Sequence, residues 1–218
     1  MSVLLAMAVF VSVHVLLARP PLRARLVGVL GGPIYLIAYS AVSVVLLTWV
    51  VRALLHAPRM FLWGTPSWAY PFAICGSLLA FCLLGVGAAL PNPLSVSLRS
   101  PTVYDPKRPG PLGWIRHPLL WGFSAWGVAH VPANGDWPSL ILFLGAAVFG
   151  VVGAAAVERR RRRQLGADTW AHLTPGRGHW NQPATLGLAC AVALWLLTAL
   201  WGHQTLFSVD PLATLGIP

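Results

Sequence analysis

The chain has 218 residues, of which 57% are hydrophobic and only 9% are charged, and its formal net charge is +10. A soluble domain of this length would carry about 25% charged residues, so the composition excludes an ordinary soluble protein and indicates an integral membrane protein. The basic residues lie in short segments between apolar runs, as the positive-inside bias predicts, and this placement argues against a nucleic-acid partner.

Six apolar segments approach the length of about 20 residues that a helix needs to cross the bilayer. Each is expected to be helical, because backbone amides in lipid must be hydrogen-bonded internally. The first segment lacks a basic region before its apolar run, so it is expected to be a retained helix and not a signal peptide. We therefore predict an all-α fold, a polytopic membrane bundle of about six helices that forms a single domain over residues 1–218. The expected segments are residues 2–18, 26–51, 70–90, 118–131, 137–157 and 185–202.

The basic residues also predict an orientation. If the loop after the first helix is cytoplasmic, all but two of the 15 basic residues fall on that side, and the exceptions are Arg52 and Arg59. This asymmetry places both termini in the periplasm of a bacterial inner membrane. Prolines are expected to end two helices, because proline lacks the amide that a helix interior needs. Pro20 and Pro21 follow the first helix, and Pro91 and Pro93 follow the third.

Few side chains in this sequence are able to carry out chemistry. All five acidic residues fall in loops or at helix ends, which argues against a carboxylate proton relay inside the membrane. His14 and His117 are expected at similar depth in the cytoplasmic half, and two imidazoles from different helices are a common way to hold haem iron. A histidine near the membrane interface is more often a hydrogen-bonded packing residue. His130 lies about 20 Å beyond His117 along a helix, so it is expected near the opposite face with His203.

Two further features allow two interpretations each. Arg116 precedes His117 and could pair with haem propionates or an anionic head group, although the positive-inside bias explains it equally well. Glu158 precedes the run Arg159–Arg163. The run is either a stop signal held by anionic lipid, or Glu158 and one arginine line a cytoplasmic pocket with Arg116.

An ordered set of motifs over about residues 1–180 resembles the NnrU family. The clearest motif is the Arg-His-Pro triplet at 116–118 with the Leu-Leu-Trp-Gly that follows it. The last helix carries no such motif. The other motifs are His14, Arg23, Leu26, Gly31, residues 35–40 with Ser43, residues 91–95, residues 126–130, Asn134-Gly135-Asp136, Glu158 with its arginine run, Gly166 and Trp170.

The resemblance implies a cofactor and a site. NnrU proteins are associated with bacterial denitrification and nitric oxide metabolism, and the plant zeta-carotene isomerase, a membrane haem b enzyme, is similar to them. The resemblance implies that His14 and His117 ligate haem b, with redox or isomerase chemistry on a lipophilic substrate. The cysteine proposed as an alternative ligand has no counterpart in Gly113-Trp114-Ile115, which argues against ligand switching.

Supporting roles follow from the same resemblance. Arg116 is expected to orient a propionate or another anion. Tyr35, Tyr39 and Ser40 are expected either to supply hydrogen bonds to the pocket or to pack helices together.

A more distant resemblance implies a different site. Membrane methyltransferases of the isoprenylcysteine type and sterol reductases also carry Arg-His-Pro, an acidic residue and a Gly-x-x-x-Trp/Tyr stretch. Here Glu158 and Gly166–Trp170 would fill those parts, and a cytoplasmic pocket would bind S-adenosylmethionine or a nicotinamide nucleotide.

A third hypothesis is a non-enzymatic assembly partner for denitrification reductases, or a transporter component. An enzyme is expected to show an apolar cleft beside His117 that opens to lipid. The sequence assigns no role to His130.

Overall fold

The computed structural model describes residues 2–174, 176–211 and 213, which form helices and connecting loops with no β-strand among them. The chain divides into two compact units. The first consists of residues 1–63 and 136–142, and the second of residues 64–135 and 143–218. The expectation of a single domain stays a prediction.

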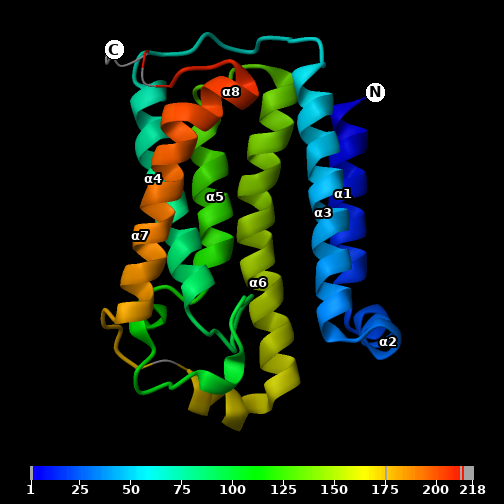
Figure 1. Cartoon of the computed structure of the whole chain (residues 1–218), viewed down its shortest axis with the longest axis vertical. Helices are drawn as coiled ribbons and strands as arrows, with labels where there is room; N and C mark the ends of the chain where they lie inside the picture. Colours follow the sequence, from blue (N-terminus) through cyan, green and yellow to red (C-terminus); the bar gives the residue numbers. More distant parts are fainter. Residues whose placement is uncertain (1, 175, 212, 214–218) are drawn as a thin grey trace. The chain divides into compact units, whose positions relative to one another are not determined.

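The first unit contains α1 (Val3–Leu17), α2 (Pro20–Leu30) and α3 (Gly32–Leu55). Helices α1 and α3 lie side by side, and α2 turns away from α1 at an angle of 70° (Figure 1). The first helix ends close to the position predicted from Pro20 and Pro21, but a second helix follows it almost at once. Pro20 and Pro21 instead open α2, because the first turn of a helix needs no amide hydrogen bond.

The expected second segment, residues 26–51, was wrong in its first part. Gly31 interrupts it with a φ of 79°, a conformation that glycine adopts without the steric penalty of a Cβ atom. The apolar residues before Gly31 therefore belong to α2, and the spanning helix α3 begins at Gly32.

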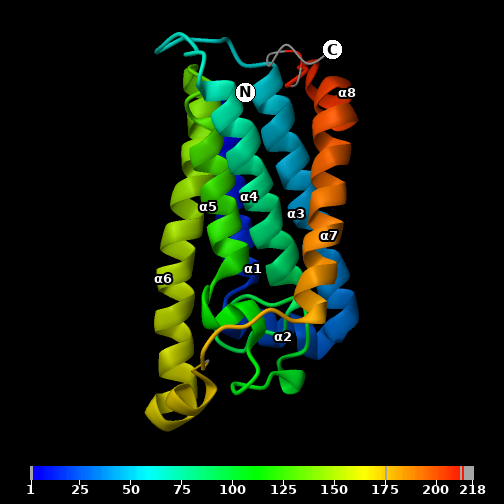
Figure 2. The ribbon, with the colours of Figure 1, turned by 90° about the vertical axis from the view of Figure 1, so that its left-hand side faces the viewer.

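The second unit is built around α4 (Ala69–Ala89), which packs against α5 (Pro118–His130) and α7 (Gln182–Leu197) (Figures 1 and 2). Helix α7 continues through a π-helical turn at Thr198–Gly202 into α8 (His203–Phe207). Gly85 and Gly187 lie where α4 and α7 cross, and a Cβ atom on either would collide with the carbonyl oxygen of the other. The two backbones approach this closely because neither residue has a side chain.

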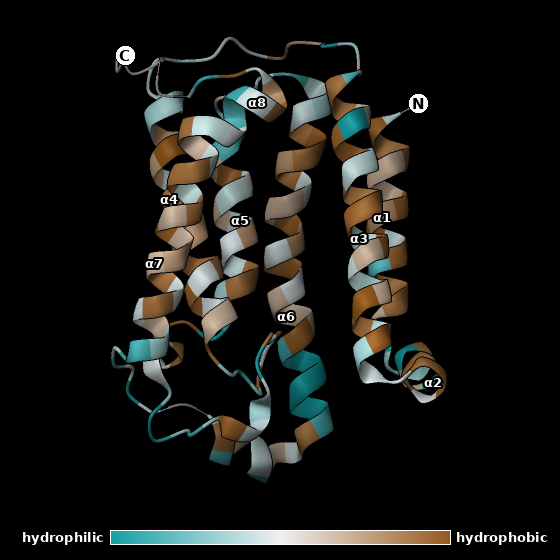
Figure 3. Ribbon diagram, in the orientation of Figure 1, coloured by the Kyte–Doolittle hydropathy of each residue, from teal (hydrophilic) through white to brown (hydrophobic). Residues whose placement is uncertain are grey.

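The fifth expected segment, residues 137–157, ends before the helix does. Helix α6 (Trp137–Leu173) passes through the whole arginine run, and its colour in Figure 3 changes from hydrophobic to hydrophilic along its length. Arginine, glutamine and leucine are good helix formers, so the loss of hydropathy does not end the helix. A kink at Gly166 (φ 76°, ψ 169°) separates the last part of α6 from the rest.

Among the described residues, four helices are long and apolar enough to cross a membrane: α3, α4, α6 and the continuous helix Gln182–Phe207. The bent pair α1–α2 adds a fifth if it counts as one span. Helix α5 matches its expected bounds, but its 13 residues fall short of the usual length. The fold class, a helical membrane bundle, is confirmed, whereas the count of about six spans is not.

The long loop between α4 and α5 packs onto the ends of these helices. It contains two 3-10 turns, Pro101–Val103 and Gly110–Gly113. Leu112 is buried in a small core with Val86, Leu90 and Ala184. The backbone amide of His179 donates to the carbonyl of Gly110 at 3.2 Å, which joins the loop to the segment before α7. The loop therefore holds its last residues in a defined place at the start of α5.

Candidate functional site

The Arg-His-Pro triplet marks the point where the long loop becomes α5. Pro118 is in the first turn of α5, and His117 precedes the helix with φ −121° and ψ 55°, outside the α region that a residue before proline avoids. Asn92 braces this turn, because its side-chain amide donates to the Arg116 carbonyl at 2.7 Å. The Asn92 side-chain oxygen accepts the Leu94 amide at 3.1 Å. The Pro91–Ser95 motif thus fixes the backbone beside Arg116.

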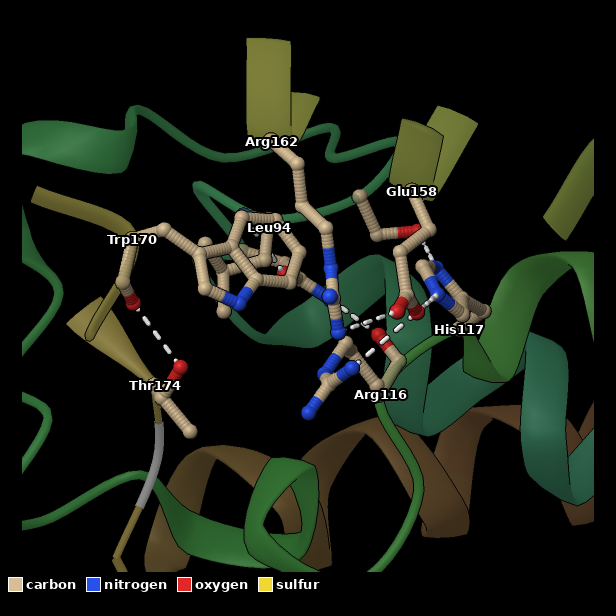
Figure 4. Close-up of polar contacts among 9 residues, drawn as sticks. Leu94, Arg116, His117, Glu158, Arg162, Trp170 and Thr174 are labelled. Carbon is tan, nitrogen blue, oxygen red and sulfur yellow. Dashed lines mark hydrogen bonds and ion pairs between the residues drawn. The ribbon is translucent and has the colours of Figure 1, made fainter. Parts of the chain in front are cut away.

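His117 is only 5% exposed, and both of its ring nitrogens are engaged. Nδ1 hydrogen-bonds the Ser95 hydroxyl at 2.7 Å. Nε2 hydrogen-bonds Oε2 of Glu158 at 3.1 Å (Figure 4). Ser95 itself is 2% exposed. These two hydrogen bonds hold the buried imidazole in one orientation. Buried polar groups generally have hydrogen-bond partners of this kind.

Glu158 is the common partner of the basic groups around it. Its Oε2 also accepts from Nη1 of Arg116 at 3.0 Å, and its Oε1 pairs with Nη2 of Arg162 at 3.0 Å. Arg162 follows Glu158 by one helical turn, so the continuation of α6 through the arginine run creates this pair. One carboxylate therefore joins the loop, the start of α5 and α6 through charge-assisted hydrogen bonds.

Trp170 lies beyond the kink at Gly166, beside both guanidinium groups (Figure 4). The Arg116 Cζ atom is 5.4 Å and the Arg162 Cζ atom 4.9 Å from the centre of its ring, within the range of cation–π attraction. Tyr104 supports the same segment from the long loop, since its hydroxyl donates to the Leu173 carbonyl at 3.3 Å. Burial raises the pKa of Tyr104, and the charge of Arg116 opposes that rise.

Arg116 keeps one hydrogen-bond donor unused. Its Nε atom is buried and has no hydrogen-bond partner among the described residues. An unsatisfied buried donor costs about 1–3 kcal/mol, more for a charged group. The side chain as a whole is 31% exposed, so a ligand is able to reach the guanidinium.

Two apolar hollows lie in the second unit. The larger, about 1300 Å³, runs along α4 and α7, and Tyr104 lines it, whereas Arg116 and His117 do not. The smaller, about 160 Å³, is lined by Ile115 and Pro118, the sequence neighbours of the pair. Of these two hollows, the smaller is the nearer in sequence to the apolar cleft expected beside His117, although His117 itself does not line it.

His14 in the first unit makes its own polar contacts. Its Nε2 hydrogen-bonds the Tyr39 hydroxyl at 2.7 Å, and its Nδ1 hydrogen-bonds the Ser43 hydroxyl at 3.2 Å. Tyr35 donates to the Leu17 carbonyl at 3.0 Å, whereas Ser40 is exposed. These contacts join α1 to α3. Ser43, four residues after Tyr39 on the same helix face, is the serine that sequence reasoning did not assign to this group.

Haem b was expected at His14 and His117, which belong to different units, and their pairing at one iron stays a prediction. Both nitrogens of each imidazole contact protein side chains, so ligation requires one of these partners to move away. Within the described part of the chain, no three histidine, cysteine or acidic side chains are grouped as metal ligands.

His130 and His203 lie together, as their expected position near one face predicted. Their rings are 6.4 Å apart and nearly parallel. His130 is buried, and its Nδ1 hydrogen-bonds the Trp126 carbonyl at 2.8 Å. This contact lies within one turn of α5 and fixes the ring against its own helix.

A family model described as NnrU protein matches residues 2–211. The chain belongs to the NnrU family. The match extends beyond the motifs recognised in the sequence, which ended near residue 180, and it includes α7 and α8. No curated protein and no solved structure gives a significant match.

In this NnrU family member the structure brings together one of the two groups of residues that the sequence suggested. Arg116, His117, Glu158 and Trp170 meet in the second unit, as the comparison with membrane methyltransferases and reductases predicted. We call these four residues and Arg162 the Arg116–Glu158 centre. The sequence could not identify Ser95 as the partner of His117, because that contact depends on the path of the long loop.

Proposed function

We propose that this NnrU family member binds an adenine-containing cofactor at the Arg116–Glu158 centre and acts there on a lipophilic molecule. The observation that carries the proposal is the state of Arg116. Its guanidinium is fixed by Glu158 and by the Trp170 ring, yet its Nε donor has no protein partner. The side chain as a whole is 31% exposed, and a negatively charged group on a ligand would pair with the exposed part of the guanidinium.

The residues of the centre would contribute to cofactor binding in different ways. The indole of Trp170 offers a flat surface on which a purine stacks. Arg116 would bind a carboxylate or phosphate of the cofactor, because a planar guanidinium can donate two parallel hydrogen bonds to such a group. Glu158 would accept hydrogen bonds from ribose hydroxyls or from an ammonium group. His117 is buried, so its part is to position Glu158 and not to touch the ligand.

Two cofactor classes fit these groups. S-adenosylmethionine offers a carboxylate to Arg116 and an ammonium group to Glu158, and it supplies a methyl group. A nicotinamide nucleotide offers phosphates to Arg116 and supplies a hydride. Both would act on a lipophilic acceptor from the membrane.

Thermal unfolding of the detergent-purified protein tests the proposal. A ligand that binds only the native state stabilises it by about 2.7 kcal/mol at a hundred times its Kd. We expect S-adenosylmethionine or a nicotinamide nucleotide to raise the unfolding temperature in a saturable way, whereas methionine and inorganic phosphate do not. If none of the cofactors raises it at millimolar concentration, the proposal is wrong.

Haem b is the second candidate, and one contact of His117 favours it. The Nδ1–Ser95 hydrogen bond is the kind of outer contact that orients a ligating imidazole, and it would leave Nε2 for iron if Glu158 moved away. An absorption spectrum of the purified protein, oxidised and then reduced with dithionite, tests this candidate. His14→Ala and His117→Ala should each lower the haem content, and His56→Ala should not. Equal haem content in all three variants would end the ligand hypothesis.

The association with denitrification and nitric oxide metabolism stays a prediction for this chain. A non-enzymatic assembly partner of a reductase would lose its phenotype in cells that lack that reductase. An enzyme that uses the Arg116–Glu158 centre would keep its phenotype there.

A further inference from the structure

A long groove of about 1300 Å³ runs along the second unit, apart from the Arg116–Glu158 centre. Its walls come from α4 and α7, and one end is formed by residues 99–109 of the long loop. Arg116, His117, Glu158 and Arg162 do not line it. The groove is therefore separate from that centre.

The walls of the groove are suited to acyl chains. Helix α4 and the continuous helix Gln182–Phe207 are both long and apolar enough to cross a membrane. Leu186 and Leu194 line the groove and remain 60% and 54% exposed. Gly85 and Gly187, where the two helices approach each other closely, also line the groove.

The loop end of the groove is positively charged. Arg99 and Arg108 line it, and neither forms an ion pair with any residue that the structure describes. Asp105 is the acidic residue at this end, and its carboxylate accepts the backbone amide of Lys107 at 2.9 Å. Two arginines and one carboxylate give this end of the apolar groove a net positive charge.

We infer that this groove binds one anionic phospholipid from the surrounding membrane. Its phosphate lies between Arg99 and Arg108, and its acyl chains lie along α4 and α7. The volume exceeds the roughly 300–1000 Å³ of a site for a drug-sized ligand, which suits a two-chain lipid. The inference does not depend on the proposed cofactor, since the two sites share none of their charged residues.

Lipid binding measured by native mass spectrometry tests the inference. Delipidated protein is titrated with phosphatidylglycerol and, separately, with phosphatidylcholine. The variant R99Q/R108Q should bind phosphatidylglycerol up to about twenty-five-fold more weakly, because each basic group near an anionic lipid contributes roughly five-fold. The matched control K107Q/R177Q removes the same charge from two exposed residues that do not line the groove, and it should bind like the wild type. Equal weakening in both variants, or equal binding of the two lipids, would overturn the inference.

Cysteine labelling supplies a readout that does not depend on charge substitutions. Cys190 on α7 lines the groove. Cys75 on α4 is exposed but does not line the groove, and it provides the control. In single-cysteine variants, phosphatidylglycerol should slow maleimide labelling of Cys190 at least ten-fold and leave labelling of Cys75 unchanged. If Cys190 instead cross-links between two copies of the chain in the presence of the lipid, the groove is an interface between copies and the inference is wrong.

Discussion

His117 depends on two neighbours that sequence reasoning treated differently. Glu158 was a candidate because it is an acidic residue at the end of an apolar run. Ser95 belonged to a recognised motif, but nothing in its local sequence indicates an imidazole 22 residues away. In the first unit Tyr39 was predicted and does contact histidine, whereas Ser43 takes the place expected for Ser40. Side chains on one helix face follow from sequence spacing, and contacts across a loop do not.

Replacing Ser95 with alanine would leave Nδ1 of the buried His117 without its partner. Such a loss costs about 1–3 kcal/mol, so Ser95→Ala should lower the free energy of unfolding by that amount. Unfolding in mixed micelles with increasing denaturing detergent measures the change. Ser40→Ala, at an exposed serine, should change stability by less than about 0.5 kcal/mol. Equal stability of the two variants would show that the Ser95 hydroxyl does not support the imidazole.

At the scale of whole elements, α6 determines which side chains meet. The end of its apolar run was predicted, but the helix continues through the arginine run and then kinks at Gly166. Helices α4 and α5 were predicted almost to the residue, because proline and turn residues bound them. Hydropathy locates apolar runs, but it does not reveal a positive φ at Gly31 or a polar continuation of a helix.

Gly166→Ala should disturb the Arg116–Glu158 centre through the backbone alone. The φ and ψ values of Gly166 lie in a region that is essentially limited to glycine, and the strain costs of order 1–3 kcal/mol. No atom lies close enough for the new methyl group to clash with it. We expect a lower free energy of unfolding and weaker cofactor binding, because the position of Trp170 depends on this kink.

Gly28→Ala is the matched control for Gly166→Ala. Gly28 also has open space around it, but it lies inside α2 with ordinary helical geometry. Alanine there should leave stability unchanged or raise it by up to about 1 kcal/mol. If both variants behave alike in detergent unfolding, the kink at Gly166 does not position Trp170.

For the molecule as a whole, composition was enough to predict a helical membrane bundle, and the motifs were enough to predict the family. The grouping of the site residues was harder to obtain. Expected depth in the membrane suggested His14 with His117, whereas the described contacts join His117 to Glu158, which also pairs with Arg116. Depth limits which side chains are able to meet, but the path of each loop decides which of them do.

The charge asymmetry of the chain predicts its orientation in the membrane. All but two of the 15 basic residues fall on one predicted side, so that side should face the cytoplasm. A reporter enzyme that is active only in the periplasm should be active when fused after Pro218 and silent when inserted near Lys107. The reversed pattern would show that the orientation is inverted.

The most direct test of the Arg116–Glu158 centre is a calorimetric titration of the purified protein with the cofactor that stabilises it. Arg116→Gln should weaken binding by roughly ten- to a hundredfold, because a hydrogen bond to a charged group contributes about 1.5–3 kcal/mol. Arg163→Gln removes the same charge from an exposed residue of the same run and should bind within about two-fold of the wild type. Wild-type affinity in Arg116→Gln would contradict the assignment of the cofactor to this centre.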